Sequence, residues 1–199
     1  AVVSGNDYSI RSVGWNDVPV SQVPCALRSV EGALSGFDPV VYSEYERNND
    51  KFRDVLEKRN RILIKNIKEM KGRPVSYCFK DTENTLRGDK NQVHTRSLHA
   101  EENAFLQITK YGGASVMGGK LFSTASPCDL CSKKAMQLGI KDIYFIDPYP
   151  GISKDHVLAN GSDKPNLVQF FGAVGTGYQR LYEPLMPYKD ELDYLSNSE

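Results

Sequence analysis

The sequence predicts an α/β fold: a mixed five-stranded sheet flanked by helices, with a largely helical insertion after the first hairpin. Two observations predict this architecture. In the second half of the chain, β-prone runs alternate with helical patterns, and a strand–helix–strand order implies a right-handed parallel crossover. At the start, two β-prone runs flank Ser4-Gly5-Asn6-Asp7, a segment that favours a tight turn and therefore an antiparallel hairpin. A hairpin joined to parallel strands makes the sheet mixed.

The first half of the chain is the expected hairpin followed by the insertion. The hairpin uses residues 1–3 and 8–15, and residues 20–97 then form a segment too long to be a plain loop. Ser43-Glu44-Tyr45-Glu46 has capping-box spacing, and apolar residues recur at helical spacings from Phe52 to Met70. One long helix, or two broken near residues 48–50, should end by residues 72–74. Its charges form a solvated face or, alternatively, a contact with a partner or another subunit.

The second half supplies the remaining elements. We expect helices over residues 98–110, 127–138, 153–160 and 175–182, and strands over residues 120–124, 141–147 and 166–171. The helix over residues 98–110 should present Ala104, Phe105 and Ile108 to a core, and it ends at a pair of glycines that favour a helix C-terminus.

Composition restricts the class of protein. The 199 residues suit a single domain over 1–199, and 25 basic residues balance 25 acidic ones. A chain without net charge has no global field that draws it to nucleic acid or to an anionic membrane, which favours a small-molecule substrate. There is no membrane-length apolar run and no signal-peptide pattern at the start. We therefore expect a cytoplasmic protein without a membrane partner.

Three residues have the spacing of a catalytic zinc site. His99 lies before Cys128 and Cys131, and three nitrogen and thiolate ligands with one open position are typical of catalytic rather than structural zinc. Glu101, two residues after the histidine, can take and return the proton of an activated water. Positions i and i+2 lie about 200° apart around a helix, so His99 and Glu101 converge only if the metal lies over the helix N-terminus. Glu102 has the wrong offset and is expected to be a solvated or structural charge.

The other two cysteines have a different interpretation. Cys25, Cys78 and His94 are widely separated in sequence, whereas a closed structural zinc site needs four ligands at close local spacing. Free cysteine is commonly a small buried apolar residue. We therefore expect no second zinc at these positions.

The motifs His99-Ala100-Glu101 and Pro127-Cys128-Asp129-Leu130-Cys131 form the pattern H-x-E and P-C-x-x-C, the signature of zinc-dependent base deaminases. The chain resembles the cytidine deaminase superfamily, most closely its deoxycytidylate deaminase branch. The resemblance implies a three-layer sandwich, an N-terminal helix missing before Ala1 and a homo-oligomer. It also implies a hydrolase acting on the C–N bond of a cyclic amidine: water attacks C4 of cytosine, and Glu101 moves protons to N3 and the departing amine.

The resemblance also implies where a nucleotide binds. Asn16 would hold the sugar, although a Pro-ended turn in which it bonds its own backbone is an equally simple interpretation. Tyr149 would cover the base, yet its Pro-Tyr-Pro-Gly setting is also ordinary turn chemistry. The full set of expected substrate-binding residues is Asn16, Ala100, Thr124, Ala125, Ser126 and Tyr149.

Two other functions remain open at this point. One is a deaminase of cytosine or adenine in single-stranded nucleic acid, and the other is a non-catalytic zinc domain that senses nucleotides. Adenosine deaminases acting on tRNA usually have glutamate immediately before Pro-Cys, where this chain has Ser126. The favoured substrate is a free cytosine deoxynucleotide (dCMP or dCTP).

Overall fold

The chain folds into two compact units. The computed structural model describes residues 1–36, 38–65, 68, 72, 74–172, 186 and 188–197. The first unit combines Ala1–Asp17 with Leu98–Tyr178, and the second combines Val18–Ser97 with Gln179–Glu199. The sequence indicated one domain with an insertion over 20–97, whereas this insertion clusters as a unit with an apolar core of its own.

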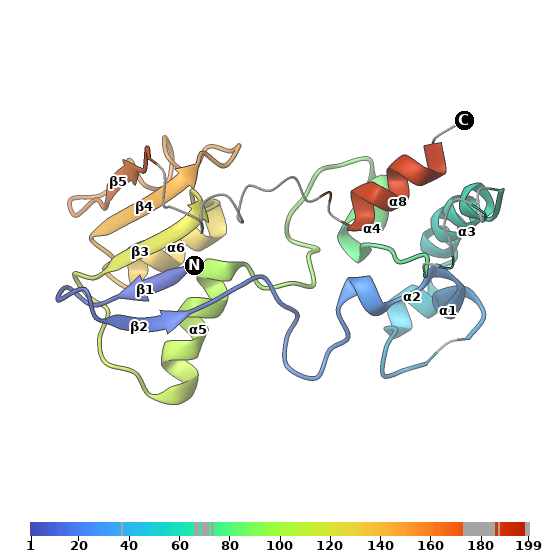
Figure 1. The fold of residues 1–199 in the computed structure, drawn as a ribbon, viewed down its shortest axis with the longest axis horizontal. Helices are drawn as coiled ribbons and strands as arrows, with labels where there is room; N and C mark the ends of the chain where they lie inside the picture. Colours follow the sequence, from blue (N-terminus) through green and yellow to red (C-terminus); the bar gives the residue numbers. More distant parts are fainter. Residues whose placement is uncertain are drawn as a thin grey trace. The chain divides into compact units, whose positions relative to one another are not determined.

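The first unit contains the mixed five-stranded sheet that the sequence predicts (Figure 1). Its strands are β1 (Val2–Ser4), β2 (Ile10–Val13), β3 (Lys120–Ala125), β4 (Asp142–Asp147) and β5 (Asn166–Gln169), in the spatial order β2-β1-β3-β4-β5. β1 pairs antiparallel with β2 and β3, and β3, β4 and β5 are parallel. The predicted hairpin and parallel crossover are both confirmed.

Helices α5 (Ala100–Tyr111) and α6 (Asp129–Gln137) pack into the same core as the sheet. The buried members of this core are Val3, Ala104, Phe105, Val116, Leu121, Ala135, Ile140, Ile143 and Leu158. At about 25 cal/mol per Å² of buried apolar surface, such a cluster is the main force that holds helices against strands.

Strand β3 presents alternate side chains to opposite faces of the sheet. Leu121 is fully buried in the core beside α5, and Ser123, two residues later, points to the same side and contacts Glu101 of α5. On the opposite side Phe122 stacks on Tyr144 of β4, with 4.9 Å between ring centroids. This alternation decides which β3 side chains reach the helices.

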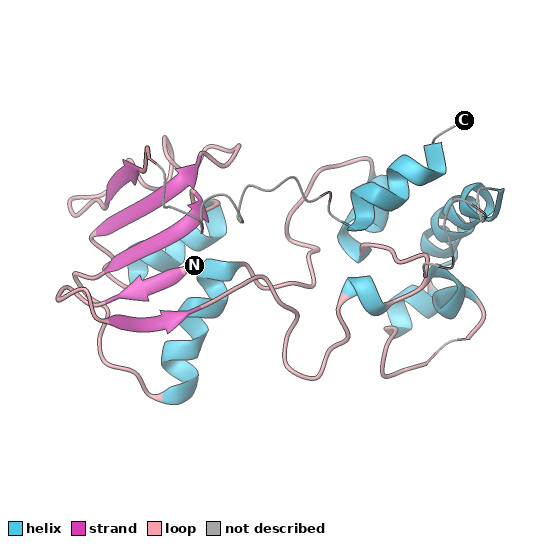
Figure 2. Ribbon diagram, in the orientation of Figure 1, coloured by secondary structure: helices cyan, strands magenta, loops and turns pink. Residues whose placement is uncertain are grey.

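The described part of the second unit is helical (Figure 2). It contains the 3-10 helix η1 (Cys25–Leu27) and helices α1 (Val30–Leu34), α2 (Glu44–Asn48), α3 (Asp50–Lys65), α4 (Phe79–Arg87) and α8 (Tyr188–Asn197). Of the two alternatives, one long helix or two helices broken near residues 48–50, the structure has the second, because α2 ends at Asn48 and α3 begins at Asp50. Ser43 and Glu46 form the predicted capping box.

A buried ion pair lies within the second unit. Arg28 is fully buried and Glu46 is 1% exposed. Arg28 donates to a Glu46 carboxylate oxygen, and the Tyr77 hydroxyl donates to the same oxygen at 2.7 Å. Arg28 also donates to the Tyr77 oxygen at 2.9 Å and lies over the Tyr77 ring. Each charge is compensated by several partners, as a buried charge requires.

One expected helix is wrong. Residues 153–160 form turns, because their backbone bonds converge on the carbonyls of Ile152 and Ser153 and do not propagate. The Asn160 side chain bonds the His156 carbonyl, which is the local competition that disfavours a helix. The expected helix over residues 175–182, which would contribute to the third layer, lies outside the described residues, as does the end of the pattern at Met70. Among the described helices, none has the length and apolar character needed to cross a membrane.

Candidate metal centre

The candidate ligands lie where two helices begin. His99 is the residue immediately before α5, and Cys128 is the residue immediately before α6. Cys131 follows within the first turn of α6. The positive ends of both helices therefore approach these side chains and favour thiolate over thiol. The expectation that the two motifs converge at helix N-termini is confirmed.

The three ligand atoms are close enough to hold one metal ion, since they all lie within 4.8 Å of one another. Nδ1 of His99 is 3.2 Å from Sγ of Cys128 and 3.6 Å from Sγ of Cys131. Zinc–nitrogen and zinc–sulfur bonds of ordinary length, arranged as a tetrahedron, separate nitrogen from sulfur by about 3.5 Å. The spacing and the ligand types both fit zinc.

Hydrogen bonds within this cluster polarise its titratable groups. The bond to Cys131 lowers the pKa of the Cys128 thiol against the opposing effect of burial, and a bond to His99 lowers it further. The hydrogen bond to Cys128 raises the pKa of His99, and the negative charges of Cys128 and Glu101 add to that rise. The bonds to Cys131 and His99 thus both favour the thiolate form of Cys128.

Glu101 lies beside the cluster in the first turn of α5 and is only 8% exposed. The hydroxyl of Ser123 on β3 donates a hydrogen bond to its Oε1 at 2.7 Å. Sequence reasoning missed Ser123. The available signal was strand periodicity, which places residue 123 on the same side of β3 as the buried Leu121.

The neighbouring carboxylate, Glu102, has a structural role. It forms an ion pair with Lys134 of α6 and so links the two helices that begin at the candidate ligands. The expectation that Glu102 is a solvated or structural charge is confirmed.

Asn16 lies next to the start of α5. Its Oδ1 accepts a hydrogen bond from the backbone N–H of Ala100 at 2.9 Å, and Asn103 donates to the carbonyl of Trp15 at 3.0 Å. Gly14 allows the chain before Asn16 to pack directly on the backbone of α5. A Cβ at residue 14 would lie 2.2 Å from the Ala100 carbonyl oxygen and 2.3 Å from the Ala104 nitrogen. Asn16 and Ala100 are thus brought together beside His99.

Ser126 and Tyr149 are also brought together. The backbone N–H of Tyr149 donates to Ser126 Oγ at 2.7 Å, and the N–H of Ser126 donates to the Asp147 carbonyl at 2.8 Å. These bonds hold the loop after β3 against the loop after β4. Thr124 and Ala125 end β3 immediately before this contact, and Thr124 is exposed.

The second pair of cysteines lies within the second unit. The thiols of Cys25 and Cys78 hydrogen-bond to each other, which lowers the pKa of Cys25 to about 5 and raises that of Cys78. Both are free and half-buried. They do not form a metal-ligand cluster with the described His94.

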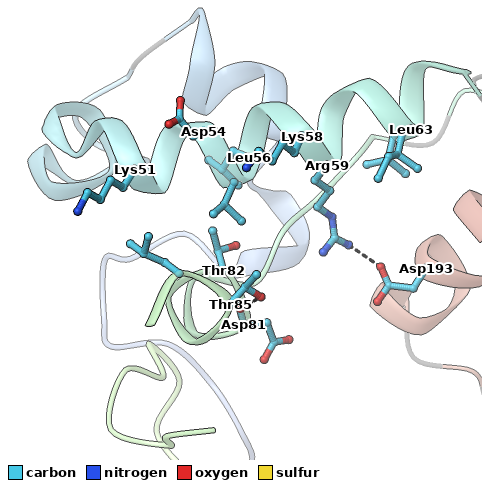
Figure 3. A pocket seen from close by; sticks show the side chains of 13 residues that line it. Lys51, Asp54, Leu56, Lys58, Arg59, Leu63, Asp81, Thr82, Thr85 and Asp193 are labelled. Carbon is cyan, nitrogen blue, oxygen red and sulfur yellow. Dashed lines mark hydrogen bonds and ion pairs between the residues drawn. The ribbon is translucent and has the colours of Figure 1, made fainter. Parts of the chain in front are cut away.

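The second unit also contains a cavity of about 660 Å³ between α3, α4 and α8 (Figure 3). Arg59 of α3 crosses toward Asp193 of α8 and donates to its carboxylate at 2.9 Å. The charged residues that line the cavity are Lys51, Lys58, Arg59, Asp54, Asp81 and Asp193. Because acids and bases are equal in number, the lining has no net charge with which to select an ion.

Comparison with known proteins assigns the cluster to a family. The model of the cytidine and deoxycytidylate deaminase zinc-binding region matches residues 39–147, more than half of the chain. ComE operon protein 2 of Bacillus subtilis is 41% identical over 54 residues, which cover 27% of this chain and 28% of that protein. A probable deoxycytidylate deaminase of Drosophila melanogaster is 33% identical over 87 residues, which cover 42% of this chain and 36% of that protein.

A solved structure shows a similar sequence match. The dCMP deaminase of cyanophage S-TIM5, in complex with dCMP and dUMP, is 32% identical, with 42% of this chain and 57% of that chain covered and a TM-score of 0.35. The chain thus spans between 28% and 36% of the length of the two curated relatives. On the family match and the clustered ligand set, the chain belongs to the cytidine and deoxycytidylate deaminase zinc-binding family.

Proposed function

We propose that the chain catalyses the hydrolytic deamination of a cytosine deoxynucleotide (dCMP or dCTP) to the uracil nucleotide and ammonia. The observation that carries this proposal is the convergence of His99, Cys128 and Cys131 at two helix starts, with Glu101 buried beside them. The similarity to deoxycytidylate deaminases supports the choice of substrate.

In the proposed reaction, His99, Cys128 and Cys131 hold the zinc. A zinc ion bound there supplies a Lewis acid that makes water acidic enough to attack at neutral pH. Glu101 would accept one proton from the attacking water and deliver it to N3 of the ring, then accept the second proton from the hydroxyl formed at C4 and deliver it to the amine that leaves C4. One water is consumed and one ammonia is released, so atoms and protons balance.

Asn16 is the proposed sugar contact. Its Oδ1 is already used by the Ala100 N–H, so the amide NH₂ is the group that remains to bond a sugar hydroxyl. Ser126 and Tyr149, tied to each other, form the proposed wall over the base, with backbone contacts from Ala100, Thr124 and Ala125. We also propose a cytoplasmic homo-oligomer without a nucleic-acid or membrane partner. The balanced charge of the chain supports the last part of this proposal, because no net positive charge draws the chain to nucleic acid or an anionic membrane.

The metal content provides the first test. We expect one zinc per chain by elemental analysis, because one ligand cluster is found among the described residues. Cys128→Ser should lose it, whereas Cys25→Ser should retain it. A second zinc that Cys25→Ser removes would contradict our assignment of Cys25 and Cys78, and full activity without metal would contradict the proposed mechanism.

The substrate is tested by ammonia release from a panel of cytidine, deoxycytidine and adenosine nucleotides and single-stranded oligonucleotides. A deoxycytidine nucleotide should react much faster than cytosine in an oligonucleotide and with little salt dependence, because strand binding through phosphates weakens steeply with salt. Preference for the oligonucleotide, lost at physiological salt, would overturn the substrate assignment.

The sugar contact is tested with a matched pair of variants in the same assay. Asn16→Asp keeps the oxygen that accepts from Ala100 but removes the NH₂ donor, so it should lower kcat/KM by about tenfold, the effect of one hydrogen bond. Asn16→Ala should lower it further because the helix start also loses its cap. Both variants should retain zinc.

A further inference from the structure

The position of Glu101 is fixed both by its own helix, α5, and by a hydrogen bond from the sheet. The helix α5 fixes its backbone, and Ser123 of β3 bonds its Oε1 at 2.7 Å. Within the described part of the chain, the Glu101 carboxylate accepts this hydrogen bond through one of its two oxygens, Oε1. The side chain therefore has a defined rotation before any substrate arrives.

The position of Ser123 is itself rigid. Its backbone lies inside the β3–β4 parallel ladder opposite Phe145. The preceding residue, Phe122, pairs with Tyr144, and Ala125, two positions after Ser123, pairs with Asp147. Side chains alternate along β3, and Leu121 is fully buried in the core. The Ser123 side chain, two residues later, therefore points to the same face of the sheet as Leu121. A hydroxyl on a fixed strand can orient a neighbouring carboxylate more reproducibly than one on a loop.

We propose that Ser123 is a positioning residue for the reaction: its hydroxyl holds Oε1 of Glu101, so that Oε2 is left as the atom that accepts and returns the proton. A carboxylate free to rotate would present either oxygen at a range of angles, and a misplaced proton acceptor slows proton transfer. This inference rests on the proposed role of Glu101.

The test compares Ser123→Ala, Ser123→Thr and Ser123→Val. Threonine keeps the hydroxyl and suits a strand, and valine has the shape of threonine without the donor. We expect Ser123→Ala and Ser123→Val to lower kcat by about 10- to 100-fold, as is common when the hydrogen-bond partner of an active-site group is removed. KM and zinc content should stay unchanged, and Ser123→Thr should recover most of kcat.

A double-variant experiment separates this inference from a general packing effect. Once Glu101→Gln has removed the proton acceptor, adding Ser123→Ala should lower kcat no further, because two residues that act as a unit are not additive. Equal kcat in wild type and Ser123→Ala, with Glu101→Gln inactive, would overturn the role of Ser123 and leave the proposed function intact. Loss of zinc in Ser123→Ala and Ser123→Val would show a structural role instead.

A second readout does not depend on turnover. In crystal structures of the zinc-loaded protein, Glu101 should keep one conformation, with Oε1 on the hydroxyl, in wild type and Ser123→Thr, and should rotate or adopt several conformations in Ser123→Ala and Ser123→Val. An unmoved Glu101 in the last two variants would overturn the inference even if no nucleotide proved to be a substrate.

Discussion

Glu101→Gln is expected to lower turnover of the cytosine deoxynucleotide by at least about 100-fold, the usual contribution of a general acid–base group, while zinc stays bound. Glutamine keeps the length and shape of the side chain, and its carbonyl oxygen can still accept the hydrogen bond that Ser123 donates to Oε1. It has no oxygen that can accept and return a proton. Ammonia release under saturating nucleotide, with elemental analysis of the same sample, measures both quantities.

The matched control is Glu102→Gln. This neighbouring carboxylate pairs with Lys134 at the molecular surface, and a partly exposed ion pair of this kind stabilises a protein by no more than about 1 kcal/mol. Turnover should therefore change little. Equal losses in the two variants would mean that the wrong carboxylate has been assigned the proton transfer.

Glu46→Ala is expected to lower the free energy of unfolding of the second unit by about 3–5 kcal/mol, the typical cost of removing one partner from a buried ion pair. Arg28 is fully buried and would be left with the Tyr77 hydroxyl and the Val41 carbonyl but no carboxylate. Urea denaturation monitored by far-UV circular dichroism measures the change. The slope of the transition should stay close to that of the wild type.

An exposed pair in the same unit provides the control. Glu57 and Arg61 form an ion pair four residues apart on α3, with side chains 46% and 75% exposed, so Glu57→Ala should cost less than about 1 kcal/mol. A Glu46→Ala loss as small as that of Glu57→Ala would show that the buried network adds little to stability.

The pH dependence of the Glu46 effect has a definite sign. Burial by itself raises the pKa of Glu46, but hydrogen bonds from Ser43 and Tyr77 and the charge of Arg28 together bring it below its ordinary value. A carboxyl group with a depressed folded-state pKa stabilises the protein above its unfolded-state pKa, and this stabilisation disappears as the pH falls through the folded-state value. The difference between wild type and Glu46→Ala should therefore shrink in acid.

The sequence predicted those elements that are stabilised by interactions between residues close in the chain. The hairpin and the capping box at Ser43 depend on residues close in sequence, and both are confirmed. The break after Asn48 was one of two alternatives that the sequence left open. The convergence of His99 with Cys128 followed from the geometry of helix starts. Short helices such as α1 escaped prediction because five residues are too few to show a period.

Other features depend on contacts between distant residues. Ser123 lies opposite Glu101 only once β3 has taken its register beside α5, and neither motif contains it. The sequence predicts Glu46 as the N3 residue of a capping box, but it does not predict the ion pair of Glu46 with Arg28, 18 positions away. No spacing rule links such residues, so their roles emerge only from the folded chain.

The close packing at Gly14 affects the entropy of the segment that carries Asn16, the proposed sugar contact. Segments that carry binding residues are usually mobile, and ordering them consumes part of the binding free energy. Here the chain lies directly on the backbone of α5, since a Cβ at residue 14 would come within 2.3 Å of Ala104 N, and the next two residues are bonded to Asn103 and Ala100. Asn16 is therefore ordered in the free protein. If Asn16 is the sugar contact that we propose, little binding free energy would be spent on ordering this segment.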